Sequence, residues 1–123
     1  MTYIAVYIYC VPKKALNKFM EIHRKVAMII GELGGDSVMY KSSDLRAKYG
    51  CGSLRDLINP REQDVIFFGV DSFRSREDYK DIMKKFDGFP KVNKLYNQVV
   101  RILDIKEIKR GELEQIIWLC SIS

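Results

Sequence analysis

The sequence has little of what metal sites, disulfide frameworks and membrane spans require. Its 123 residues include only three cysteines and one histidine. Cys10, Cys51 and Cys120 are an odd number at wide spacing, with no CxxC pair and no Cys/His cluster, so we expect neither a metal site nor a disulfide framework. No apolar run reaches the ~18 residues of a membrane span, and the apolar start lacks a basic n-region and a cleavage site. We therefore expect a cytoplasmic protein without a membrane segment.

The sequence also lacks the nucleotide-binding and hydrolase motifs that are recognised by their spacing. GxGxxG, the P-loop, GxSxG and HExxH are all absent, and no cofactor is indicated. The net charge of +5 is modest, and the basic residues are scattered among 16 acidic ones, which is typical of a solvated surface. The segment 46–61 is made basic by Arg46, Lys48, Arg55 and Arg61, and binding of phosphate or nucleic acid is its functional interpretation. Without an aromatic RNA-binding signature, nucleic acid is the less favoured partner.

The segment 64–73, DVIFFGVDSF, is apolar on both faces of a strand. A strand with one solvated face alternates apolar and polar residues, and this segment does not. It is therefore predicted to be a central strand that is covered on both sides. In so short a chain, we expect the second cover to come from another subunit. The alternation places Val65, Phe67 and Gly69 on one side and Ile66, Phe68 and Val70 on the other.

Periodicity predicts the other elements. The first strand, 3–11, carries aliphatic residues on one face, which we expect to meet a helix layer, and tyrosines on the other. A helix is predicted over 15–33 and stops at two glycines, a strand follows over 37–45, and 46–62 is mostly loop. A second helix begins after a capping box at 75–78, and capping of this helix start accounts for Asp71, Glu77 and Asp78 without a catalytic role. A further helical turn is predicted around 92–96. The fourth strand is predicted over 99–108, followed by a turn at 109–111.

This order, β-α-β-β-α-β, is the split pattern of the ferredoxin-like fold. We expect an α+β domain over 1–111, with a four-stranded antiparallel sheet and two helices on one face. The tyrosine face of the sheet would be covered by the same face of a second copy, which makes a sheet-to-sheet homodimer. The apolar tail 112–123 is expected to dock on its own domain or on the partner.

Three stretches resemble a known group. They are the strand that runs into a Pro-Lys helix at 7–14, the segment from GSLR at 52–55 through PRE at 60–62 into the strand 65–68, and the exit at 71–76 into the second helix. These stretches resemble the dimeric α/β-barrel superfamily, and within it the small uncharacterised bacterial family typified by YbaA. The resemblance implies a homodimer with a cavity near the sheet.

The superfamily includes cofactor-independent monooxygenases acting on polyketides, haem-degrading enzymes and chlorite dismutases. Its haem-binding members carry their ligand histidine on or near the second helix. His23, the one histidine of this chain, is predicted on the first helix, so the resemblance does not extend to haem binding.

Tyrosines of the first strand are the best pocket candidates. Tyr7 and Tyr9 would lie beside Phe67, with Arg101 from the predicted fourth strand as a cation. Aromatic walls with one cation are suited to a planar or anionic small molecule. The alternative interpretation, which the usual roles of tyrosine favour, is that these residues simply pack the dimer interface.

His23 lies on the apolar stripe of the first predicted helix. It is either a general base or ligand that reaches the cavity, or a hydrogen-bonded residue at the edge of the core. The second interpretation is favoured because no other His or Cys lies at ligand spacing. Three functions stay open: a homodimeric protein that binds a small molecule, a cofactor-independent oxygenase, and a nucleic-acid-binding protein. Whether the chain is an enzyme is not decided by the sequence.

Overall fold

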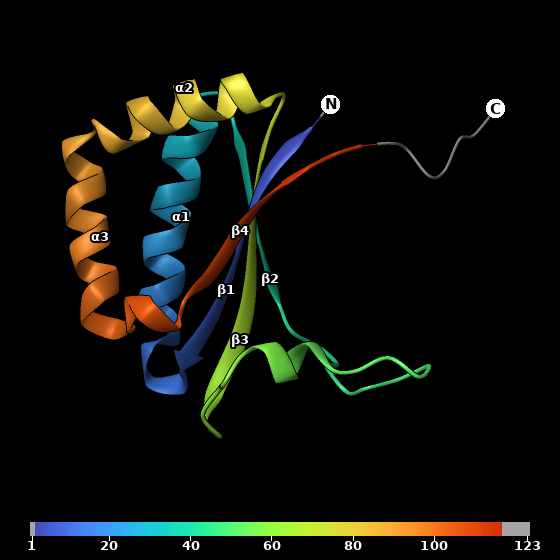
Figure 1. Cartoon of the computed structure of the whole chain (residues 1–123). Coiled ribbons are helices and arrows are strands. Elements are labelled where there is room, and N and C mark those ends of the chain that lie inside the picture. Colours follow the sequence, from blue (N-terminus) through green and yellow to red (C-terminus); the bar gives the residue numbers. More distant parts are fainter. Residues whose placement is uncertain (1, 117–123) are drawn as a thin grey trace.

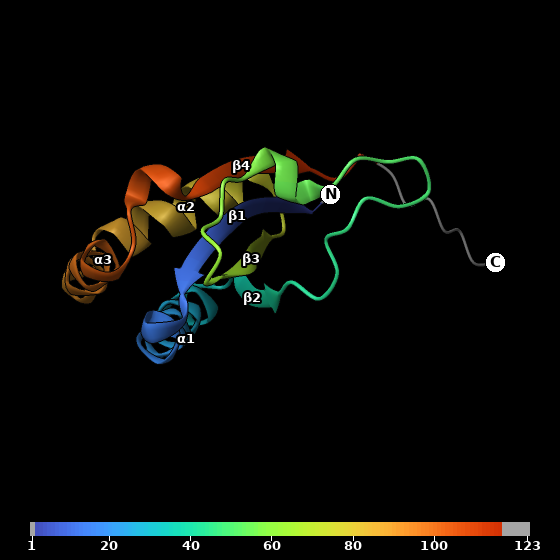
Figure 2. The same ribbon diagram turned by 90° about the horizontal axis from the view of Figure 1, so that it is seen from below.

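The computed structural model describes residues 2–116 as one α+β domain (Figure 1). A four-stranded antiparallel sheet is covered on one side by α-helices, which confirms the predicted ferredoxin-like fold class (Figures 1 and 2). No helix within these residues has the length and apolar character needed to cross a membrane. The strands are β1 (Tyr3–Pro12), β2 (Asp36–Lys41), β3 (Asp64–Phe73) and β4 (Lys109–Glu114); the α-helices are α1 (Leu16–Glu32), α2 (Arg76–Asp87) and α3 (Pro90–Ile102).

The sheet has the strand order β2-β3-β1-β4. Strand β3 pairs with β1 on one side and with β2 on the other, so the prediction of a central strand at 64–73 is confirmed. Tyr7 lies opposite Gly69 and Tyr9 opposite Phe67 in the β1–β3 pair. Residues that lie directly opposite share a face of the sheet, and this register therefore fixes which side chains meet.

The two faces of β1 point in the directions opposite to those predicted. Tyr9 and Val11 pack with Phe67 and with Phe19 of α1, so the tyrosine face meets the helices. The aliphatic residues, which we expected under the helices, lie on the open face instead. The physical reason is space, because tyrosine rings are long enough to reach across the gap between the sheet and the helices.

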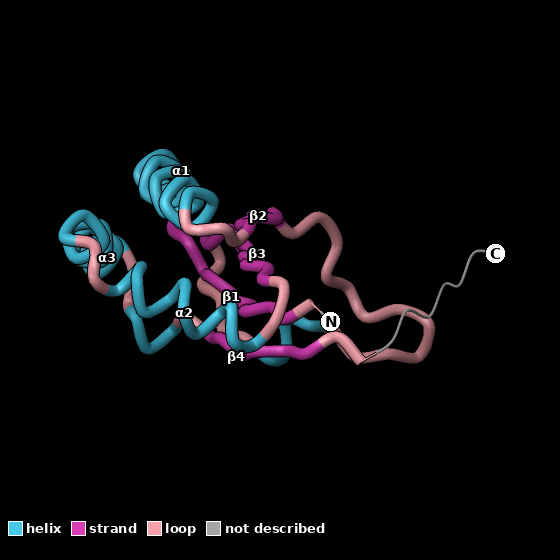
Figure 3. The backbone as a smooth tube through the Cα atoms, turned by 90° about the horizontal axis from the view of Figure 1, so that it is seen from above, coloured by secondary structure: helices cyan, strands magenta, loops and turns pink. Residues whose placement is uncertain are grey.

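The helix layer contains three α-helices, one more than predicted (Figure 3). The segment predicted as the fourth strand, 99–108, lies mostly in helix α3 and in a short 3₁₀ helix, Ile105–Glu107. Leu95 of α3 packs with Ile22 and Ile29 of α1 in a buried cluster between the two helices. The aliphatic run at 99–102 continues this helical stripe, and its Val and Ile content misled the strand prediction.

Strand β4 forms from the residues that were predicted to be a turn and the start of the tail. Arg110 lies opposite Tyr7, and Glu112 lies opposite Ala5. The sheet thus includes three residues that the sequence analysis assigned to the tail, 112–114. The expected docking of the tail concerns mainly residues 117–123, which lie outside the described part of the chain.

Two local predictions for the helix ends are confirmed. Gly34 ends the first helical region with φ +103°, a left-handed conformation that suits glycine. Ser75 caps α2, because its Oγ accepts a hydrogen bond from the backbone N–H of Asp78 at 3.1 Å. The carboxylate of Asp78 pairs with Arg74 rather than reaching back to the cap.

Candidate functional site

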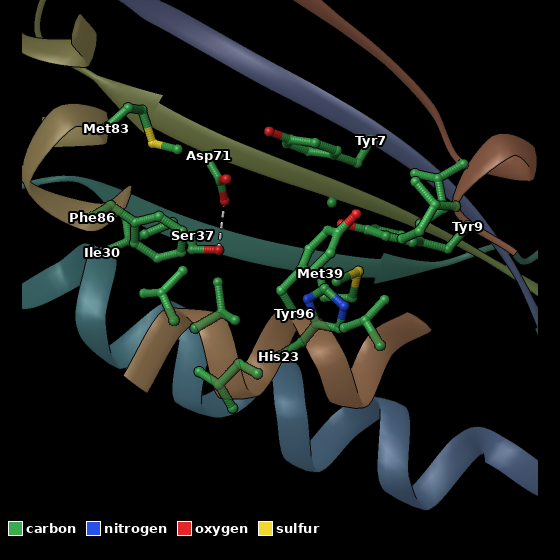
Figure 4. A pocket seen from close by; sticks show the side chains of 17 residues that line it. Tyr7, Tyr9, His23, Ile30, Ser37, Met39, Asp71, Met83, Phe86 and Tyr96 are labelled. Atoms are coloured by element: carbon green, nitrogen blue, oxygen red, sulfur yellow. Dashed lines mark hydrogen bonds between the residues drawn. The ribbon is translucent and has the colours of Figure 1, made fainter. Parts of the chain in front are cut away.

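A cavity of about 230 Å³ lies between the helix layer and the sheet (Figure 4). All three α-helices and the strands β1, β2 and β3 contribute side chains to it. The residues that line it are Tyr7, Tyr9, His23, Val26, Ile30, Ser37, Met39, Gly69, Asp71, Met83, Phe86, Val92, Leu95, Tyr96, Val99, Ile105 and Ile108. An apolar cavity of about 150 Å³ suffices for benzene, so this one has room for a small organic molecule.

The cavity exists in part because β3 carries a glycine at its centre. A Cβ atom at Gly69 would lie 3.3 Å from Cε2 of Tyr9 and 3.5 Å from Cε of Met39. Any larger side chain at this position would point into the space that Tyr9 and Met39 border. Glycine in a strand interior is a signal of such close approach, and it is visible in the sequence although we did not interpret it there.

His23 contributes a neutral imidazole to the cavity. Its ring packs against Tyr9 and Phe19, at centroid distances of 5.0 and 4.4 Å. Burial lowers the pKa of His23 to about 4, so the ring is uncharged at neutral pH. Its Nε2 is buried and has no hydrogen-bond partner among residues 2–116. Within residues 2–116, no group of three or more metal-ligating side chains includes His23, and its Nε2 lacks the hydrogen bond that we expect of a core histidine.

A carboxyl group lies in the same cavity and was missed by the sequence analysis. Asp71 of β3 accepts a hydrogen bond from the hydroxyl of Ser37 on β2 at 2.6 Å (Figure 4). Burial raises the pKa of Asp71, and the hydrogen bond from Ser37 partly opposes this shift. We had attributed Asp71 to capping of the second helix, but Ser75 performs that role. The alternation of β3 carried the signal, since Asp71 shares the face of Phe67 and Gly69.

The predicted pocket residues are placed in two different regions. Tyr7, Tyr9 and His23 come together around the cavity. Phe67 lies behind them, with its ring 5.1 Å from that of Phe19. Arg101 lies elsewhere, because 99–102 is helical and its exposed side chain borders a shallow hollow on the outside of α3.

Tyr7 was predicted to have Arg101 as a neighbouring cation, but the cation next to it is Arg110. The guanidinium carbon of Arg110 lies 5.4 Å from the centre of the Tyr7 ring. Its charge is balanced, because Nη2 donates to Glu112 at 2.9 Å. Tyr3 and Tyr79 also donate to this carboxylate, at 2.6 and 3.0 Å. The hydrogen bond from Tyr3, followed by that from Arg110, lowers the pKa of Glu112 to about 2.

The basic segment 46–61 is partly neutralised by its own neighbours. Asp44 pairs with Arg46 at 2.9 Å and with Lys48 at 2.7 Å, and Arg61 pairs with Glu107 at 3.0 Å. These pairs reduce the positive charge that the segment could present to phosphate. Within residues 2–116, no group of three or more His, Cys, Asp and Glu residues has the geometry of a metal site.

The comparisons with known proteins show a family of unknown function and a shared fold. The family model described as "Protein of unknown function (DUF1428)" matches residues 2–101. No curated protein matches the sequence.

Solved structures with this fold differ widely from the chain in sequence. A mutant of SnoaB, a cofactor-independent oxygenase from Streptomyces nogalater, aligns with a TM-score of 0.64 at 9% identity over 98% of each chain. Rv0793 from Mycobacterium tuberculosis aligns with a TM-score of 0.61 at 12% identity, over 98% of this chain and 100% of that one. A dimeric ferredoxin-like protein of unknown function from Jannaschia sp. CCS1 aligns with a TM-score of 0.56 at 14% identity, over 92% and 99%. At these identities the likeness concerns the fold alone.

Proposed function

The chain belongs to the DUF1428 family, and we propose that it is a homodimeric protein that binds a small, mainly apolar molecule in the cavity between its sheet and its helices. The observation that carries this proposal is the cavity itself, which combines apolar walls with a few polar groups, as ligand sites do. We also propose that the chain is related to the small bacterial family typified by YbaA, which its sequence resembles.

The polar groups of the cavity support a binding role over simple packing. Buried polar atoms in folded proteins nearly always have a hydrogen-bond partner. The Nε2 atom of His23 has none among the described residues, and leaving such an atom unpaired costs about 1–3 kcal/mol. A bound ligand with a polar group would satisfy it. The glycine at position 69 costs about 0.5–1 kcal/mol of strand stability relative to alanine and keeps the cavity open.

The open face of the sheet supports the homodimer. Its exposed residues include Val38 at 39%, Tyr40 at 56% and Leu113 at 55% of their full exposure. Val6 and Phe68, which lie opposite Val70 and Ile8 in the central pair, share this face. Large apolar patches of this kind usually mark an interface. A solved structure with the same fold is described as dimeric, and we propose the same for this chain through its aliphatic face.

Ethylbenzene is a suitable probe of the cavity, because it is small, apolar and uncharged. At a concentration ten times its Kd, it should raise the unfolding free energy of the protein by about 1.4 kcal/mol, which a thermal or urea unfolding curve detects. Gly69→Val fills the cavity and should remove this stabilisation. Gly52→Val is the matched control, because nothing lies within 4 Å of a Cβ atom at position 52. Equal stabilisation of both variants, or none of the unmodified protein, would contradict the proposal.

A second candidate function is a cofactor-independent oxygenase. It is favoured by the structural likeness to SnoaB, described as such an enzyme, and by the neutral His23 in an apolar cavity. A neutral imidazole in such a place can act as a general base toward a bound phenol. An oxygen electrode with a naphthohydroquinone as probe tests this function. Protein-dependent oxygen uptake should fall at least tenfold in His23→Ala and stay unchanged in Arg101→Ala; uptake that survives in His23→Ala would exclude the histidine as the base.

A further inference from the structure

The charges of the cavity lining are of one sign. Of the lining residues within 2–116, Asp71 is the one acid, and no Lys or Arg is among them. Arg110, whose guanidinium lies over the Tyr7 ring, is paired with the carboxylate of Glu112. An anionic ligand would therefore meet a carboxyl group and no compensating cation, which makes its desolvation costly. We therefore expect the anionic ligand that the sequence suggested to bind poorly in this cavity.

Among residues 2–116, the carboxyl group of Asp71 has no cationic partner. Its Oδ1 accepts the hydrogen bond from Ser37 at 2.6 Å, and burial raises its pKa. No Lys or Arg among the described residues lowers that pKa; the hydrogen bond from Ser37 is the one opposing effect. Carboxylates that are removed from water are usually paired with a cation. A partly buried carboxylate in a cavity, without such a partner, is a candidate for binding a charged group of a ligand.

Tyrosine rings line the same cavity as this carboxyl group. Tyr7, Tyr9 and Tyr96 all border it, and Figure 4 shows Tyr7 beside Asp71. The face of an aromatic ring carries negative electrostatic potential and attracts an ammonium group within about 6 Å of its centre. Aromatic faces and a carboxylate favour the same kind of ligand, namely an organic cation.

We propose that the ligand of this cavity is a small organic amine in its ammonium form, bound through the carboxylate of Asp71 in a cavity that tyrosine rings help to line. This inference rests on the proposed function, since it requires that the cavity takes a ligand. Ser37 holds one carboxylate oxygen, and the ammonium group binds the other. The hydrocarbon part of the amine lies against Met39, Phe86 and Leu95.

Three probes of similar size separate charge from shape. Benzylamine is cationic at pH 7, phenylacetate is anionic, and ethylbenzene is neutral. Calorimetric titration should give benzylamine at least tenfold tighter binding than phenylacetate, which corresponds to about 1.4 kcal/mol. If ethylbenzene binds but benzylamine is no tighter than phenylacetate, the inference is overturned while the proposed function stands. If none of the three binds, the proposed function itself fails.

The variant Asp71→Asn tests whether Asp71 is responsible for the tighter binding of benzylamine. The amide keeps the size of the side chain and can still accept from Ser37, but it carries no charge. Benzylamine should lose its tenfold advantage, while the Kd of ethylbenzene changes by less than about twofold. The matched control is Asp81→Asn on the exposed side of α2, which should keep the advantage. A preference for the amine that survives in Asp71→Asn overturns the assignment, and the ranking of probes on the unmodified protein tests the inference even if the variant does not fold.

Discussion

At the scale of single residues, His23 lies in an environment that disfavours its charged form. It is packed between Tyr9 and Phe19, and burial lowers its pKa to about 4. In the unfolded chain its pKa is about 6.5, so between these two values the unfolded state binds a proton that the folded state does not. The unfolding free energy should therefore be unaffected by His23 above pH 6.5 and should fall as the pH drops toward 4, by up to about 3 kcal/mol.

The comparison of the protein with His23→Leu isolates this effect from the other titrating groups. Urea unfolding between pH 7 and pH 4 should show a smaller loss of stability for the variant than for the unmodified protein. The difference between the two curves should grow over the window from pH 6.5 to 4. Parallel curves would show that His23 is accessible to protons in the folded state.

Residue patterns predicted which side chains share a face but not where each face points. The alternation of β1 correctly grouped Tyr3, Tyr7 and Tyr9, and the structure places them toward the helices. Both faces of β1 and β3 are apolar, so hydrophobicity alone could not assign them. Asp71 was overlooked because a carboxyl group four residues before a helix cap resembles a capping residue. Its position opposite Ala5 in the sheet becomes visible only once the register is known.

At the scale of elements, the start of α2 depends on one hydroxyl group. Ser75 accepts a hydrogen bond from the backbone N–H of Asp78 and begins the helix that carries Met83 and Phe86 to the cavity. Ser75→Ala should lower the unfolding free energy by about 1 kcal/mol, the usual cost of an N-cap. Urea unfolding measures it, with Ser43→Ala in the exposed loop after β2 as the control. A loss no greater than that of the control would contradict the role of the cap.

The elements that the sequence predicted best are those with one clear apolar stripe and a recognisable end. The first helix has both, and its end at Gly34 is confirmed. The prediction of a strand over 99–108 was wrong. Val99 and Ile102 pack toward the core at a spacing that suits a helix, although their residue types favour a strand. Burial of Leu95 against α1 decides the competition, and this contact between distant segments could not be seen in the local sequence.

For the whole molecule, the aliphatic face of the sheet predicts a stable homodimer. Light scattering at micromolar concentration should give a mass near twice 14.4 kDa. Tyr40→Glu adds a charge to this face at a position that is 56% exposed in the single chain, so it should give a monomer that remains folded. Tyr49→Glu in the loop, where the side chain is 97% exposed, is the matched control and should stay dimeric. A monomeric unmodified protein would contradict the proposed assembly.

The most direct test of the cavity as a binding site is the NMR spectrum of the methionine methyl groups during titration with ethylbenzene. Met39 and Met83 line the cavity from the sheet and from α2, whereas Met28 is 65% exposed on α1. Saturable shifts of the Met39 and Met83 signals, with the Met28 signal unchanged, are the predicted result. The absence of any shift at Met39 and Met83, or equal shifts at Met28, would contradict binding in the cavity.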